Sequence, residues 1–385
     1  MSNIYNCTPY KIDIPDITGS EGIYLFDKKG KKYMDLESGV WCTSVGHNNE
    51  QLNDVIKKQI SLIMHAGFSY SGTIVEESAE SILKITGLEN GKCVFLCSGS
   101  EAIELARQIS KKVTGKKISM TMHDSYLGSY SSVTDRSENW YIFNWEKCKS
   151  CKFKRNCRID CEQFENIPEN LSDFIFEPGS SSGFVRFPPE SLILNIVKIV
   201  KTNGGKIILN EVTTGIGRTG RWFGFNHYGI KADMIAIGKG VGNGYPVSVT
   251  VLNKETADQS AKAGFKYMQS HQNDPLGASI VKEVINIIDS DDMVAEAERK
   301  GELFLQQLMD LQKNKIIIGV RGRGLLFAVD ICDKKTGNYI YKKLLDKGFI
   351  ICNRGALFRI DPPLTIREEE FDLFIKAFNN ILDSI

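Results

Sequence analysis

Residues 92–113, KCVFLCSGSEAIELARQISKKV, constrain the fold more than any other stretch of this chain. An apolar run is followed by a small polar turn and then by apolar residues at helical spacing, which predicts a buried strand, a tight turn and a helix. Two more apolar runs, in KIILNEVTTG and ADMIAIGKGVGNGYPVSVTVL, lead into glycine-containing loops. Strands that alternate with helices build mostly parallel sheets, so we predict an α/β protein whose large domain has such a sheet flanked by helices.

The segments on either side of this core predict smaller units. Residues 22–41 carry two alternating apolar runs around a turn, which is typical of a β-hairpin. Residues 50–64 and 75–85 have helical spacing, and the region from about Gly319 reads as a separate α+β unit. We expect an N-terminal segment at 1–50 that joins a small domain, a large domain at 51–290 with an insert at 145–165, and the small α+β domain at 291–385.

The composition excludes several functions. The 385 residues carry a formal net charge of +1, which gives no electrostatic reason to expect nucleic acid or a membrane surface as a partner. The N-terminal residues lack the apolar stretch of a signal peptide, and no apolar run approaches the roughly eighteen residues of a membrane span. We expect a cytoplasmic protein, in which thiols stay reduced and clustered cysteines bind metal more often than they form disulfides.

Two motifs have a chemical interpretation beside an ordinary structural one. In SGSEAIE, the backbone amides of Gly99 and Ser100 at a helix N-terminus would suit a phosphate, or Ser100 is the N-cap of an ordinary turn. In IAIGKGVGNGYP, Lys239 follows an apolar strand among glycines, where the charged amine is disfavoured. Such an amine suits Schiff-base formation. The alternative is a loop lysine that reaches solvent.

Six motifs follow one another along the chain: SGSEAIELA, HDSYLG, FEPGSSSG, NEVTTGIGRTGRWFGFNHYGIKAD, GKGVGNGYP and RIDPPLTI. Together they closely resemble the class III pyridoxal-phosphate aminotransferases, from about Gly22 to the C-terminus. The resemblance implies the fold-type I architecture and a pyridoxal 5'-phosphate cofactor. It also implies transfer of an amino group from an amino acid or amine donor to a 2-oxo acid.

The resemblance assigns roles to matching positions. Lys239 would form the Schiff base with the cofactor and move the substrate proton. The positions that would hold the cofactor are Gly99 and Ser100 at its phosphate, Tyr126 and Val212 on its two ring faces, and Thr213 near its ring hydroxyl. Ser270 would reach the phosphate in the neighbouring subunit, with Gln272 as a weaker candidate, which implies a homodimer with shared active sites.

The resemblance also points to two residues that would contact the substrate, and to two positions where this chain departs from the family pattern. Arg359 would grip a substrate α-carboxylate, or form a surface ion pair, and Trp41 would line the substrate pocket, or simply fill the core. Asn210 stands where the family has the Asp that keeps the ring nitrogen protonated, so we expect a weaker electron sink. Ser182 stands where some branches have a Glu that pairs with this arginine, so we expect Arg359 to stay open to a carboxylate.

The insert contains four cysteines, spaced C-x2-C-x5-C-x3-C, at Cys148, Cys151, Cys157 and Cys161. These fourteen residues resemble one cysteine cluster of the auxiliary iron–sulfur domains of radical enzymes. Four thiolates suit a 4Fe-4S cluster or a zinc ion, and the compact run, without two separated pairs, favours the cluster. A structural staple is favoured over a redox role, and a loop of free thiols is the remaining alternative.

Three functions therefore stay open. Transamination is favoured because most of the site fits it. Racemisation, decarboxylation or elimination on the same fold would fit Asn210 in place of the family Asp. A catalytically degenerate, metal-bearing binding or regulatory protein is the third possibility, against which the presence of Lys239, Tyr126, Gly99 and Ser100 argues.

Overall fold

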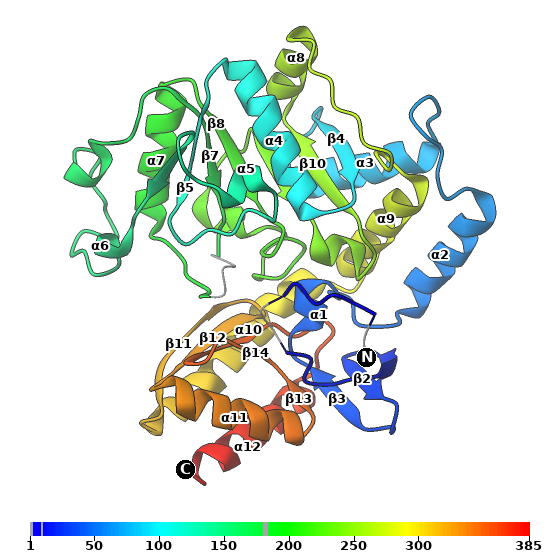
Figure 1. Cartoon of the computed structure of the whole chain (residues 1–385), viewed down its shortest axis with the longest axis vertical. Helices are drawn as coiled ribbons and strands as arrows, with labels where there is room; N and C mark the ends of the chain where they lie inside the picture. The colour runs from blue at the N-terminus through cyan, green and yellow to red at the C-terminus, as the bar shows by residue number, and fades with distance from the viewer. Residues whose placement is uncertain (1–2, 9–10, 180–183) are drawn as a thin grey trace.

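The computed structural model describes residues 3–8, 11–179 and 184–385 (Figure 1). Its central sheet has seven strands in the order β4, β10, β9, β8, β7, β5, β6. Their bounds are β4 Lys92–Leu96, β5 Ile118–Met122, β6 Trp140–Phe143, β7 Leu171–Phe176, β8 Lys206–Asn210, β9 Met234–Ile237 and β10 Ser248–Leu252. Neighbouring strands run parallel, except that β10 is antiparallel to both β4 and β9. The α/β prediction with a mostly parallel sheet is confirmed.

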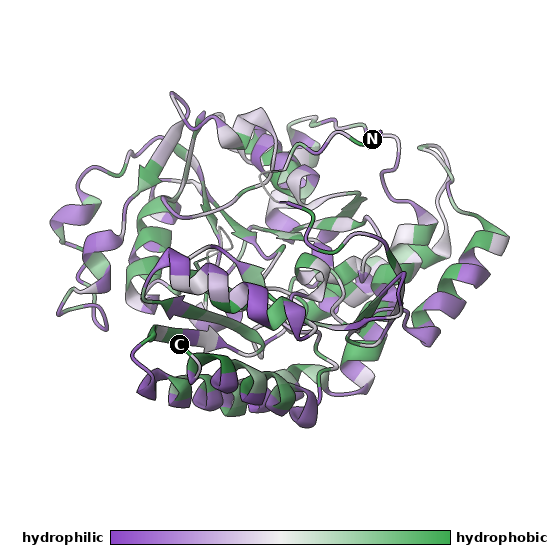
Figure 2. Ribbon diagram, turned by 60° about the horizontal axis from the view of Figure 1, so that its bottom comes forward, coloured by the Kyte–Doolittle hydropathy of each residue, from purple (hydrophilic) through white to green (hydrophobic). Residues whose placement is uncertain are grey.

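Helices cover both faces of this sheet, because alternate side chains of each strand point to opposite sides. Phe174 and Phe176 belong to the same core cluster as residues of α7 (Glu190–Thr202), whereas Ile175 and Ile208 pack with residues of α4 (Gly99–Thr114). The other helices of this part are α2 Glu50–Leu62, α3 Thr73–Thr86, α5 Ser131–Thr134, α8 Lys254–Lys262 and α9 Pro275–Ser290. Figure 2 shows the apolar sides of the helices turned inward.

Two four-stranded sheets form the lower part of the molecule in Figure 1. The expected hairpin is present as β2 (Tyr24–Asp27) and β3 (Lys32–Asp35), with β1 (Ile17–Glu21) beside β2 and β13 (Phe349–Ile350) parallel to β3. The other sheet contains β11 Ile317–Arg323, β12 Leu326–Ile331, β15 Leu357–Ile360 and β14 Cys352–Asn353. The long helices of this part are α10 Met293–Asp310, α11 Lys334–Asp346 and α12 Glu368–Leu382. The domain division stays a prediction, which the β3–β13 pairing supports.

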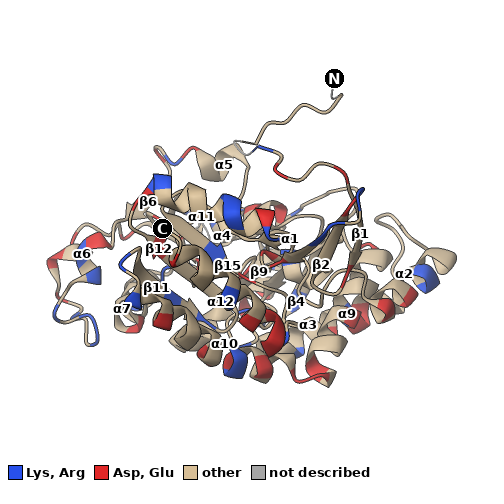
Figure 3. Ribbon diagram, turned by 90° about the horizontal axis from the view of Figure 1, so that it is seen from below, with Lys and Arg blue, Asp and Glu red and all other residues tan. Residues whose placement is uncertain are grey.

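Short helices and loops complete the chain. They are α1 Ser38–Trp41, α6 Glu146–Lys149, η1 Glu162–Phe164, η2 Gly224–Tyr228, η3 Lys239–Gly242 and η4 Leu311–Lys313. The insert with α6 projects beside α7 (Figure 1). Acidic and basic residues are spread over the outer helices (Figure 3). Within the described part of the chain, no helix is long and apolar enough to cross a membrane.

Candidate active site

The candidate site lies at the carboxyl edge of the parallel strands. The segments that follow β5, β7, β8 and β9 begin there, and open α/β sheets bind ligands at this edge because loops from several strands meet. The segment after β5 carries Tyr126, Glu177 follows β7, Asn210 ends β8, and Lys239 follows β9. The topology thus brings together residues from four separate motifs.

Lys239 begins η3 with a left-handed backbone, φ +48°, which is uncommon for a residue with a side chain. Burial is the largest influence on its amine and lowers the pKa below the usual value, and Arg359 acts in the same direction. Cys42 and Glu177 oppose the shift. The disfavoured charge agrees with the sequence-based expectation, and a strained backbone at such a position is typical of functional sites.

The N-terminus of α4 forms a narrow cradle next to Lys239. A side chain at Gly99 would place its Cβ 2.7 Å from Cγ1 of Val212, so only glycine fits. Gly238, the residue before Lys239, is also close, because a Cβ there would lie 3.3 Å from the same Cγ1 atom. The helix N-cap is Ser98, which forms a capping box with Glu101, so the alternative interpretation of Ser100 as N-cap is wrong. The first amides of α4 have no partner within the helix and can meet an anion.

Tyr126 is held at its backbone from two sides. Its amide donates to Oε2 of Glu177 at 3.0 Å, and its carbonyl accepts from Nδ2 of Asn210 at 2.9 Å. The other atom of the Asn210 amide, Oδ1, accepts from the backbone of Val212 at 3.3 Å. Oδ1 can still accept one more hydrogen bond and Nδ2 keeps one N–H, but Asn210 has no charge to offer to a ring nitrogen. Tyr126 is 46% exposed, and its hydroxyl lies 3.0 Å from Oγ of Ser129, which leaves the ring face open to a ligand.

Two buried polar atoms near this cradle have no hydrogen-bond partner among the described residues: Oγ1 of Thr213 and Nε1 of Trp41. Buried polar atoms are normally satisfied, so each such atom calls for an explanation. A polar ligand would satisfy them, and the cradle at Gly99 would take its phosphate. The residues present thus fit pyridoxal phosphate.

Trp41 lies between two cations. The Lys239 amine is 5.3 Å from the centre of a Trp41 ring, and the Arg359 guanidinium carbon is 3.5 Å from it. Trp41 is 6% exposed, so it is buried and also faces the site. The structure therefore joins the expected substrate positions Trp41 and Arg359 to Lys239.

Arg359 is fully buried on β15, and the alternative of a surface ion pair is wrong. Its Nε donates to Asp361 at 2.9 Å, and its Nη2 lies 3.1 Å from Oε1 of Glu37. The expectation that Arg359 stays open because Ser182 cannot pair with it is also wrong, since Glu37 takes that place. Ser182 itself lies outside the described residues. Burial, and then the charge of Asp361, raise the pKa of Glu37 to about 7.

Ser270 and Gln272 lie on another surface. Ser270 is exposed, and Gln272 lines a surface cavity of about 1170 Å³ together with Phe68, Tyr70 and Met268, a cavity that Lys239 does not line. Within one chain, these two positions are not brought to Lys239. This placement is the one expected of residues that serve the neighbouring subunit.

The four cysteines are reduced and lie near one another. Burial, followed by the neighbouring thiols of Cys157, Cys161 and Cys151, raises the pKa of Cys148 to about 11. The insert is attached to α7, because the Cys157 amide donates to Ser191 Oγ at 3.0 Å and Nδ2 of Asn195 donates to the Cys157 carbonyl at 2.8 Å.

The sulfur atoms do not form a tight tetrahedron. Within the residues that the structure describes, the group of metal-ligand atoms that all lie within 4.8 Å of one another is His65, His271 and Asp274, on the surface. There, each histidine Nδ1 lies against one oxygen of the same carboxylate, at 2.5 and 2.6 Å, which is the geometry of hydrogen bonds. No set of three thiols in the insert meets the same limit.

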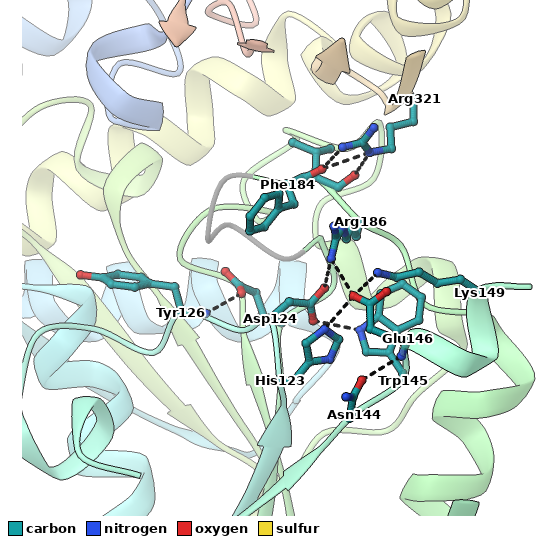
Figure 4. A network of polar contacts seen from close by, with 12 residues as sticks. His123, Asp124, Tyr126, Asn144, Trp145, Glu146, Lys149, Phe184, Arg186 and Arg321 are labelled. Atoms are coloured by element: carbon teal, nitrogen blue, oxygen red, sulfur yellow. Dashed lines mark hydrogen bonds and ion pairs between the residues drawn. The ribbon is translucent and has the colours of Figure 1, made fainter. Parts of the chain in front are cut away.

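A polar network joins the insert to the segment that carries Tyr126 (Figure 4). Glu146 on α6 contacts Lys149, His123 and Arg186. The hydrogen bond from Lys149 first, then the one with His123 and the charges of Lys149 and Arg186, lower the pKa of Glu146 to about 2. Trp145 donates to Oδ1 of Asp124 at 2.9 Å. Asp124 stands two positions before Tyr126 in the chain, so the conformation of the insert and that of the Tyr126 segment are linked.

Three carboxylates of the site were missed from the sequence. Glu37 follows the N-terminal hairpin, Glu177 begins the EPG motif, and Asp361 stands two residues after Arg359. Asp361 could have been found, because the alternation of a strand places residues i and i+2 on one face. Glu37 is 322 residues from Arg359 in sequence, and no local pattern predicts their contact.

Comparison with known proteins agrees with the geometry. Residues 10–382 match the sequence model of the family "Aminotransferase class-III". An acetylornithine aminotransferase of Archaeoglobus fulgidus is 30% identical over 377 residues, covering 94% of each chain. A leucine/methionine racemase of Thermococcus litoralis is 29% identical over 383 residues, covering 90% of this chain and 86% of its own. A solved Bacillus anthracis aminotransferase superposes with a TM-score of 0.91 at 22% identity, covering 99% of this chain and 96% of its own, and shares the fold.

Proposed function

Because this chain belongs to the class III aminotransferases and has their fold-type I architecture, we propose that it moves an amino group from an amino acid or amine to a 2-oxo acid at Lys239. Pyridoxal 5'-phosphate, when bound, supplies the electron sink that lets the bond from Cα to its hydrogen break. A cytoplasmic location, in which the thiols stay reduced, is part of the proposal.

The observation that carries this proposal is the position of Lys239. Its amine has a lowered pKa, stands on a strained turn at the carboxyl edge of the sheet, and lies next to the Gly99 cradle. In our proposal, Lys239 binds the cofactor covalently and holds the proton taken from the substrate Cα. Gly99 and Ser100 hold the phosphate, Tyr126 and Val212 enclose the ring, and Thr213 binds the ring hydroxyl.

A single-turnover experiment tests this function. After borohydride reduction of the holoenzyme, mass spectrometry should find the cofactor on the Lys239 peptide. Without reduction, a panel of amino donors in deuterium oxide should yield one equivalent of 2-oxo acid per active site. Absence of the modified peptide would overturn the role of Lys239 and favour a degenerate binding protein.

Racemisation is the second candidate, and two observations favour it. Asn210 carries no charge that could hold a proton on the ring nitrogen, and its hydrogen bond to the Tyr126 carbonyl fixes the amide in place. The racemase of T. litoralis is also one of the similar relatives. The same experiment separates the two reactions, since a racemase returns the donor with deuterium at Cα and no 2-oxo acid.

We also propose a homodimer with shared sites. Phe68, Tyr70 and Met268 are 62%, 78% and 79% exposed and line one surface cavity, which a second copy would cover. Gln272 lines this cavity and the exposed Ser270 is two residues away, so both would then reach the phosphate in the partner. Light scattering should give twice the chain mass for the wild type, and Met268→Glu should shift it toward one chain.

The four cysteines are proposed to hold a 4Fe-4S cluster. Tetrahedral zinc, with Zn–S distances of about 2.3 Å, holds its sulfur atoms about 3.8 Å apart. No three of the insert thiols lie within 4.8 Å of one another among the described residues, so the choice of the cluster rests on the compact spacing of the cysteines in the sequence. The cluster would act as a staple that fixes α6 and, through the network of Figure 4, the Tyr126 segment.

Anaerobic purification with iron, sulfide and zinc analysis tests the metal. We expect about four iron and four sulfide per chain, which Cys148→Ser and Cys157→Ser should lose. The matched control is Cys332→Ser, since Cys332 is an exposed thiol outside the insert. Zinc in place of iron would overturn the cluster, and retention of iron by both insert variants would overturn the ligand assignment.

A further inference from the structure

Arg359 already has two carboxylate partners before any substrate arrives. Asp361 and Glu37 each contact its guanidinium group, through Nε and Nη2 respectively, and the charge of the buried Arg218 also acts on Asp361. Two guanidinium groups therefore already meet two carboxylates, and a third carboxylate would leave excess negative charge away from water, which is costly. If Arg359 is the anchor of a substrate carboxylate, one of the two carboxylates has to give way.

The two carboxylates differ in how firmly they are held. The side chain of Asp361 is 0% exposed, its amide donates to the Leu36 carbonyl at 2.8 Å, and its carbonyl accepts from the Ser38 hydroxyl. The side chain of Glu37 is 21% exposed and reaches Arg359 from the turn between β3 and α1. Glu37 can therefore swing away without moving β15, whereas Asp361 cannot.

The backbone next to Glu37 is strained. Ser38, Val40 and Trp41, which follow it directly, all have a left-handed φ, between 50° and 65°. Such a turn is maintained only when its surroundings hold it, and strain of this kind collects at ligand clamps and switches. It points Glu37 and Trp41 at the same guanidinium group, from two sides.

We propose that Glu37 is the exchangeable counter-ion of Arg359, which a substrate carboxylate displaces on binding. The inference rests on the proposed function, because it takes Arg359 as the carboxylate anchor. Glu37 thereby supplies the partner that Ser182 cannot. It determines which substrates the pocket accepts.

The consequence concerns the class of amino donor. When an α-amino acid or a 2-oxo acid binds, its carboxylate replaces Glu37 on Arg359. When the reacting carbon of the donor carries no carboxylate, Glu37 stays and keeps Arg359 neutral. The pocket can therefore accept a substrate with a carboxylate on the reacting carbon in one half-reaction and a substrate without one in the other. Terminal amines are thus candidate amino donors.

The displacement is also linked to protons. Asp361, Asp35, Cys352 and Tyr341 surround Glu37 as acidic groups, and Arg359 is the facing cation. When Glu37 moves off Arg359, it loses the cation that favours its charged form. Burial and the acidic neighbours continue to disfavour that charge, so Glu37 leaves Arg359 most easily when it is protonated. With a pKa of about 7 for Glu37, carboxylate binding is strongest below pH 7 and weakens as the pH rises through 7.

Calorimetric titration of the holoenzyme with propionate, which cannot react, tests the proposal. At pH 6 the wild type and Glu37→Gln should bind alike, and at pH 8 the variant should bind about tenfold tighter, since one pH unit above the pKa is a factor of about ten. The wild type should take up close to one proton at pH 8, read from buffers of different ionisation enthalpy, and Glu37→Gln none. Propionamide, without the charge, should bind both proteins equally.

Glu37→Asp keeps the charge and should keep the pH dependence, and thermal melting shows whether each variant is folded. Equal propionate affinity of wild type and Glu37→Gln at pH 8, or loss of pH dependence in Glu37→Asp, would overturn the exchange and leave a fixed ion pair. Failure of the wild type to bind propionate at pH 6 would overturn it as well. The titration needs no turnover, so binding as described without conversion of any donor would count against the proposed function alone.

Discussion

The turn that carries Lys239 and the insert that carries the four cysteines are held in place in opposite ways. Around Lys239, backbone and side chains pack so closely that Gly99 admits no Cβ and Gly240 would place one 2.3 Å from Ser44 Oγ. The insert has mostly exposed residues between Cys151 and Cys161. Polar contacts join it to α7 and Arg186, and Trp145 and Phe164 at its two ends pack into the core.

The two regions owe their fixed conformations to different interactions. Close packing fixes the Lys239 turn before any ligand binds, since core atoms cannot move far. The insert has too few buried apolar side chains to be fixed in this way, and a metal that cross-links four thiolates would supply what packing does not. Variants in the two regions should therefore fail differently.

The largest effect is expected at Lys239. Lys239→Ala should lower the single-turnover rate by a factor of about 10³ or more, because it removes both the covalent attachment and the base. The melting temperature should change little, since the side chain forms no ion pair with any residue that the structure describes. Stopped-flow measurement of 2-oxo acid checks the rate. A loss below about tenfold would move the base to another residue.

The next effect should be confined to the insert. Cys148→Ser should make the segment between Cys148 and Cys161 sensitive to trypsin, which cleaves after its lysines and arginines, while the remaining core stays intact. Limited digestion followed by mass spectrometry measures this, with Cys332→Ser as control. Cleavage spread over the whole chain would mean that the insert supports the entire fold.

A third variant tests the packing of the cradle. Gly99→Ala should force Val212 away and weaken cofactor binding about tenfold or more, since overpacking typically costs about 1–3 kcal/mol. Val212→Ala in the same chain should restore part of the affinity because it removes the clash. Fluorescence titration of the cofactor measures both. Equal weakening in the single and double variants would contradict the steric explanation.

The smallest effect concerns the link between the regions. Glu146→Gln removes a half-exposed carboxylate that pairs with Lys149 and Arg186, and such pairs contribute about 0–1 kcal/mol. Cofactor affinity should fall no more than about fivefold. The matched control is Glu162→Gln in the same insert, which forms no ion pair among the described residues. A larger loss at Glu146 would make the network essential to the site.

Much of the fold and part of the site could be predicted from the sequence. The strands that end at Asn210 and before Lys239 are continuous apolar runs. Parallel pairing brings their carboxyl ends to one edge of the sheet, whatever the conformations of the loops that follow. The sequence also predicts the helix that begins at Gly99. Its N-cap is Ser98 and not Ser100, and the pattern alone does not decide between two serines two residues apart.

What could not be predicted are contacts between distant segments. The Glu37–Arg359 pair joins the turn before α1 to strand β15. The serine at position 182 shows that the usual partner of this arginine is missing, but it does not show which residue takes its place. Charge pairs of this kind depend on three-dimensional packing and leave no periodic signal in either segment.

The most direct test of the central claim follows nitrogen. The holoenzyme is given a ¹⁵N-labelled amino donor and an unlabelled 2-oxo acid, and the products are analysed by mass spectrometry. If Lys239 carries out transamination, ¹⁵N should appear in the amino acid formed from the 2-oxo acid, and this transfer should be absent in Lys239→Ala. Label that stays in the donor while its Cα hydrogen exchanges with solvent would contradict transamination and establish the racemase instead.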